Sequence, residues 1–197
     1  MFDEGKFTGI DFRHEVEIGI TEHFQIGIYV ANWNYDGDEG TTHYNSASAE
    51  FIYNLTNPVT DLAGISLYEE LAGGHRFFES ETKFIVQKNF GPLILLYNLT
   101  VEAESAGEGL SEHEGEIQNA FGACYEITPR LSVGAEALHE VVIPEWHRSE
   151  AKNNFFTGPN ISWRGNRWFS TVTALKQFTN TDDEPDYQVR MIFGVSL

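Results

Sequence analysis

The 197-residue sequence predicts an all-β protein, an antiparallel up-and-down transmembrane β-barrel with eleven strands. Apolar and polar residues alternate with period two along successive segments, and turn residues separate those segments. Mean hydropathy is only −0.31, and no apolar run approaches the roughly 18 residues that a spanning helix requires. A barrel strand exposes only alternate residues to lipid, however, so the average hydropathy of a barrel stays near that of a soluble protein.

The alternation is clearest in residues 9–21. Every even position from Ile10 to Ile20 is apolar except His14, whereas no odd position carries a large apolar side chain. A helix with 3.6 residues per turn could not collect these residues on one face. The segment is therefore expected to form a strand with one apolar and one polar face.

Ten further segments are predicted to be strands. Nine repeat the alternation, and residues 168–177 carry apolar side chains on both faces. The ten segments are 24–33, 47–55, 62–71, 78–88, 93–104, 116–127, 131–140, 155–164, 168–177 and 187–197.

The connections are predicted to alternate in length. Tight links such as 21–23 and 128–130 follow the odd-numbered strands, and longer polar links such as 34–46 and 105–115 follow most even-numbered ones. Short turns at one end and long loops at the other are typical of outer-membrane barrels. Aromatic residues also gather near the predicted strand ends, as a bilayer interface favours: Phe24, Trp33, Tyr35, Phe77, Phe90, Tyr125, Trp146, Trp163, Trp168 and Tyr187.

An odd number of strands gives the first and last strand the same direction, so they cannot close the barrel as an antiparallel pair. We treat residues 1–197 as a single domain and expect the precursor to carry a signal peptide and a twelfth strand upstream. Residues 1–6 are too short for a span of about 9–11 residues. Another segment could supply the strand, or the two edges could pair in parallel, as in the odd-numbered mitochondrial channel.

The final segment ends in strict alternation. One face of it carries Tyr187, Val189, Met191, Phe193, Val195 and Leu197. Together with the turn sequences at 20–27 and 127–134, this ending resembles Gram-negative outer-membrane barrels of the porin-like or small-transporter kind. The resemblance implies a place in the bacterial outer membrane, contact with its lipid, and recognition of this last strand by the barrel assembly machinery as an insertion signal. Many such barrels end in an aromatic residue, from which Leu197 departs.

The predicted lumen face is strongly acidic. Continuing each alternation inward places thirteen acids there: Asp11, Glu15, Glu17, Glu50, Glu70, Glu79, Glu81, Glu102, Glu104, Glu116, Glu126, Glu136 and Glu140. Four bases share the face: Arg13, Lys83, Arg164 and Arg190. Crowded carboxylates take up protons or recruit cations, which predicts a passive channel or a binder for small cationic or polar solutes.

Two other interpretations remain open. Salt-bridged side chains, among them the pairs Arg13–Glu15 and Lys83–Glu81, could fill a lumen of this size and give a non-conducting structural or partner-binding barrel. The chain could also be a soluble β-sandwich or a lipocalin-like ligand binder. A protein that stays soluble without detergent would favour the last interpretation.

Composition and spacing argue against other functions. The net charge of −18 argues against nucleic acid as a partner, because the protein and the nucleic acid are both negatively charged and repel each other. The single Cys124 excludes a disulfide framework, and the histidines lack zinc-motif spacing, so no metal or cofactor is expected. His139 and Ser149 do not reproduce the His-x-Ser pattern of outer-membrane lipid hydrolases. We therefore expect no catalytic site.

Overall fold

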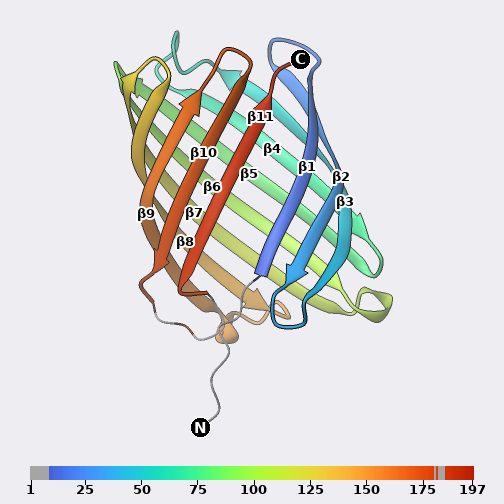
Figure 1. Cartoon of the computed structure of the whole chain (residues 1–197). Helices are drawn as coiled ribbons and strands as arrows, with labels where there is room; N and C mark the ends of the chain where they lie inside the picture. The colour runs from blue at the N-terminus through green and yellow to red at the C-terminus, as the bar shows by residue number, and fades with distance from the viewer. Residues whose placement is uncertain (1–8, 180, 182–184) are drawn as a thin grey trace.

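The structure is a computed structural model that describes residues 9–179, 181 and 185–197. It consists of strands and two short 3-10 turns, η1 (Glu108–Leu110) and η2 (Arg148–Glu150) (Figure 1). No helix among the described residues is long and apolar enough to cross a membrane. The strands are β1 (Gly9–Gly19), β2 (Phe24–Asp36), β3 (Thr41–Thr56), β4 (Gly64–Gly74), β5 (Phe77–Phe90), β6 (Leu93–Ala106), β7 (Glu112–Thr128), β8 (Leu131–Pro144), β9 (Lys152–Arg164), β10 (Trp168–Gln177) and β11 (Tyr187–Val195).

All eleven strands form one antiparallel sheet in which each strand pairs with its neighbours in sequence. The sheet is strongly curled, with tilted strands, into the shape of an open barrel (Figure 1). This confirms the predicted all-β, up-and-down fold. Strands β1 and β11 run toward the same end of the barrel, where the C-terminus and the β1–β2 turn lie (Figure 1). Within the described residues no ladder joins these two strands, as their common direction predicts.

Strand lengths differ from prediction at the end of the barrel opposite the C-terminus. Strand β3 starts at Thr41 and β7 at Glu112, several residues earlier than expected, so the connections before them shrink to 37–40 and 107–111. The predicted long loops at these two places are wrong. Backbone hydrogen bonds between the strands continue through polar residues that the hydropathy pattern assigns to loops. In the β2–β3 hairpin, a T-shaped contact of Trp33 with Tyr44, with 5.4 Å between the ring centroids, stabilises the extended part.

A β-bulge preserves the apolar outer face of β2. The partner of His14 is Ala31, but the partner of Glu15 is Tyr29, so Val30 is an extra residue on β2. An inserted residue resets the two-residue period. Val30 and Trp33 therefore both lie exposed on the outer face although three positions separate them.

The two faces of the sheet have opposite chemistry. The outer face exposes large apolar side chains from one end of the chain to the other, among them Ile18, Phe51, Leu67, Phe84, Val101, Phe121, Ile161 and Met191. Most of the buried side chains are polar or charged, including Ser46, Ser48, Glu50, Glu70, Thr100, Asn154 and Thr173. The protein thus buries polar groups and exposes apolar ones.

An apolar cluster occupies one part of the interior. Leu138 of β8, Phe156 of β9 and Leu175 of β10 are buried and pack together, with Ala120 of β7 against them. This cluster accounts for the two-sided apolar pattern of β10, because Val172 faces outward while Leu175 faces into the cluster. Hydrocarbon therefore fills the part of the lumen beside these three residues.

Replacing Phe156 tests the cluster. Phe156→Ala removes a side chain that is 0 % exposed, and the resulting cavity is expected to lower the free energy of unfolding by about 3–5 kcal/mol. The adjacent Phe155 is 37 % exposed on the outer face, so Phe155→Ala is the matched control and should cost clearly less. Denaturant titrations followed by tryptophan fluorescence compare the two variants. Equal losses would contradict a buried cluster at Phe156.

Candidate functional site

The ladder register aligns glutamates across the inner face. Glu50 lies directly opposite Glu70, Glu70 opposite Glu81, Glu81 opposite Glu102, and Glu102 opposite Glu116. At its start the row continues through Gly27 to Glu17 of β1. We call this set the acidic row: Glu17, Glu50, Glu70, Glu81, Glu102 and Glu116.

A second row lies two residues away along each strand. It contains Glu15 at one side and Glu79, Glu104 and Glu114 at the other, with Tyr29, Ser48 and Ala72 between them. The two rows together form what we call the acidic wall, which spans β1 to β7. Like charges placed directly opposite on paired strands destabilise a sheet. The arrangement therefore costs folding free energy unless protons or cations neutralise it.

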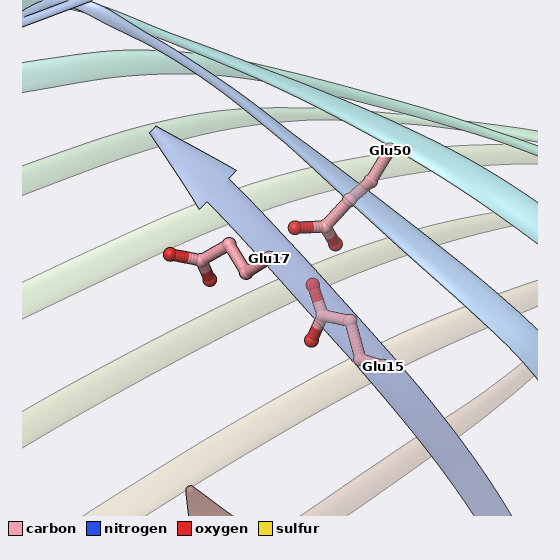
Figure 2. A group of neighbouring side chains, drawn as sticks. All are labelled: Glu15, Glu17 and Glu50. Atoms are coloured by element: carbon pink, nitrogen blue, oxygen red, sulfur yellow. The ribbon is translucent and has the colours of Figure 1, made fainter. Parts of the chain in front are cut away.

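Figure 2 shows the corner of the acidic wall nearest the first strand, where Glu15 and Glu17 of β1 and Glu50 of β3 point into the lumen. One carboxylate oxygen from each of the three lies within 4.8 Å of the other two. Gly27, on the intervening strand β2, creates the room. A Cβ at this position would overlap Oε1 of Glu15 and the side chain of Glu50.

Arg13 provides one counter-charge, but not where the sequence predicted it. The expected pair with Glu15 is wrong, because the Arg13 guanidinium forms a salt bridge with Glu70 of β4. The curvature of the sheet brings β4 within reach of the long Arg13 side chain, whose guanidinium lies 4.1 Å from the centroid of the Tyr29 ring. Tyr68 donates its hydroxyl to the same Glu70. Two donors thus stabilise this buried carboxylate.

Lys83 supplies the second counter-charge, and here the predicted pair is confirmed. Its Nζ lies 2.7 Å from Oε1 of Glu81 and 4.5 Å from the centroid of the Tyr68 ring. The hydroxyl of Tyr29 donates to Oε2 of Glu50 over 3.1 Å. Tyrosines therefore act as neutral donors between carboxylates, a role that the strand alternation did not reveal.

The centre of the acidic wall lacks such partners. One carboxylate oxygen from each of Glu79, Glu102 and Glu104 lies within 4.8 Å of the other two. Within the described part of the chain, none of these three side chains receives a hydrogen bond or an ion pair. All three are half-buried. This trio therefore has the least compensated negative charge of the wall.

The remaining predicted residues also lie on the inner face. Asp11 accepts a hydrogen bond from Asn34 over 2.8 Å, and Glu136 forms a salt bridge with Arg190. Glu126 and Arg164 lie near the tight turns, beside a cavity of about 470 Å³. Glu140 lines a second cavity of about 350 Å³ with Glu114, Glu116 and Lys152.

Sequence reasoning missed Glu114 and Lys152. Both continue the inward parity of their strands, Glu114 two residues before Glu116 and Lys152 opposite Val142. Both lie in predicted loops, to which the strand alternation does not extend. A longer β7 would have revealed Glu114.

The proposed insertion-signal residues lie along the outer face of the last strand. Tyr187, Val189, Met191, Phe193 and Val195 face outward on β11 and are exposed, and Leu197 follows the strand's end. Their predicted recognition by an assembly machinery stays a prediction.

The chain was compared with known protein families and with curated proteins. Residues 3–190 match the model of DUF6662, a family of unknown function. The chain belongs to this family. No curated protein matches it.

Substituting Gly27 tests whether the carboxylates are packed as described. Gly27→Ala would force Glu15 and Glu50 apart and is expected to lower the free energy of unfolding by about 1–3 kcal/mol. The matched control is Gly122→Ala, because a Cβ at that inward-facing glycine would have its nearest neighbour 3.9 Å away. Unfolding midpoints at neutral pH measure both. Unchanged stability of Gly27→Ala would show that the carboxylates lie elsewhere.

Proposed function

We propose that this protein is a bacterial outer-membrane β-barrel whose acidic wall concentrates small cations or cationic polar solutes and lets them pass. The observation that carries the proposal is the acidic wall, in which glutamates of five consecutive strands lie directly opposite one another. Pairs of like charges lower the stability of a sheet, so folding does not explain them. Carboxylates arranged side by side around a pore are, however, the groups that cation-preferring channels use.

The outer face supports the membrane part of the proposal. Large exposed apolar side chains occur on every strand, and contiguous apolar surface of this extent is unfavourable in water. Aromatic rings lie at strand ends on both sides of the barrel, such as Trp168 at the start of β10, beside the tight turns, and Tyr187 at the start of β11, at the opposite end. Amphipathic rings at both interfaces favour a bilayer over a soluble sandwich core.

The apolar cluster favours a second candidate, a barrel that does not conduct and serves a structural or partner-binding role. Leu138, Phe156 and Leu175 fill part of the lumen with hydrocarbon. A path for ions would then have to run along the opposite, acidic side. Electrical recordings separate the two functions directly.

In planar bilayers under a salt gradient, the protein is expected to conduct with a reversal potential that indicates cation preference. The triple variant Glu79→Gln, Glu102→Gln and Glu104→Gln removes three carboxylates that have no partner among the described residues, so it should reduce the preference several-fold while the fold is retained.

The matched control removes three exposed acids outside the strands, Glu22→Gln, Glu108→Gln and Glu150→Gln. It carries the same change in net charge and should keep the wild-type selectivity, since exposed charges are screened by salt. Absence of conductance, or a reversal potential without cation preference, would contradict the proposal and favour the partner-binding barrel.

Extraction tests the membrane part separately. With its apolar outer face in contact with lipid, the protein should remain in the membrane fraction through a high-salt wash and require detergent for release. A monodisperse, folded protein in buffer without detergent would contradict the proposal and favour a soluble ligand binder.

A further inference from the structure

A cavity of about 470 Å³ lies at the lumen mouth beside the β7–β8 and β9–β10 turns. Its inner part is lined by side chains of the inner face, among them Ile94, Ser132, Ser162, Thr171 and Phe169. This is within the volume range of small-molecule sites. The cavity lies away from the uncompensated trio of the acidic wall and shares none of its residues.

The rim of the cavity is basic. Arg130 from the β7–β8 turn, Arg164 from the end of β9 and Arg167 from the β9–β10 turn all line it, together with one carboxylate, Glu126. None of the three arginines forms an ion pair with a described residue. The chain has only 12 Lys and Arg residues and 30 Asp and Glu residues. Three arginines without an ion-pair partner among the described residues therefore give this cavity a positive rim in a protein that is negatively charged as a whole.

Several polar groups of the cavity are hydrogen-bond donors. Nη2 of Arg130 donates to Oδ1 of Asn166 over 3.3 Å, which links the two turns and holds the rim together. Below the rim, the hydroxyls of Ser162 and Thr171 lie 2.7 Å apart, and one of them keeps a proton free for a third partner. Guanidinium and hydroxyl donors are the groups that proteins use to bind phosphate oxygens.

We propose that this cavity binds a phosphate group, held by Arg130, Arg164 and Arg167 at the rim and by the hydroxyls of Ser162 and Thr171 below it. The apolar walls of Ile94 and Phe169 accommodate a neutral portion of the ligand. Either a free phosphate compound or a phospholipid headgroup presents this chemistry at a barrel mouth. The site does not depend on cation passage through the lumen.

Two titrations of the full chain in maltoside detergent distinguish the sources. Isothermal titration with inorganic phosphate tests the free anion. Stepwise addition of phosphatidylglycerol to the micelles tests the headgroup, and Trp163 and Trp168, which line the cavity, report on it by fluorescence. Saturable binding in at least one titration is expected, and a response to phosphatidylglycerol alone assigns the site to lipid.

The double variant Arg164→Gln and Arg167→Gln should weaken that binding about tenfold or more, the loss expected when charge-assisted hydrogen bonds are removed. The control, Arg76→Gln and Arg148→Gln, removes two exposed arginines near the opposite end of the barrel and should leave binding unchanged. If the double variant does not fold, Arg167→Gln alone serves, since Arg167 lies in a turn outside the ladders. No saturable binding in either titration, or an equal loss in the control, would overturn the proposal.

Discussion

The register of the antiparallel ladder is the constraint on which the rest of the structure depends. Each strand hydrogen-bonds to its neighbour in sequence, and one residue of slip would turn every side chain to the other face. The β-bulge at Val30 shows how the register is kept, because one inserted residue on β2 returns the apolar side chains that follow it to the outer face. The same register brings Glu50, Glu70 and Glu81 into a single line.

Two unlike walls follow from this register. Strands β1 to β7 carry the acidic wall, whereas Leu138, Phe156 and Leu175 form an apolar cluster on β8 to β10, on the same face as Glu136 and Glu140 of β8. Beside a wall of low polarity, the field of the carboxylates is less screened than in bulk water. Arg13 and Lys83 offset two of the charges, and the basic rim at Arg164 and Arg167 lies at the mouth beside the β7–β8 and β9–β10 turns. The acidic wall, the apolar cluster and the basic rim therefore occupy different parts of the interior.

The sequence predicted much of the fold because period-two alternation depends only on residues within one strand. All thirteen predicted acids lie on the inner face, as do the four bases. What alternation could not provide was the alignment between strands, which depends on where each strand begins. The start of β7 at Glu112 brought Glu114 into the wall, and sheet curvature paired Arg13 with Glu70 across three strands. The cavity at Arg130 depends on two turns distant in sequence, a contact that no local pattern indicates.

The two edge strands have a consequence for the behaviour of the isolated protein. Every residue of β1 is exposed, and within the described residues no ladder joins it to β11. An edge of this length offers its amide and carbonyl groups as a template for another strand. A twofold rotation places the β1 strands of two copies antiparallel to each other, the orientation that such pairing requires. Self-association should therefore rise with protein concentration and proceed through backbone groups, so that altering side-chain charge would slow it less than capping the edge.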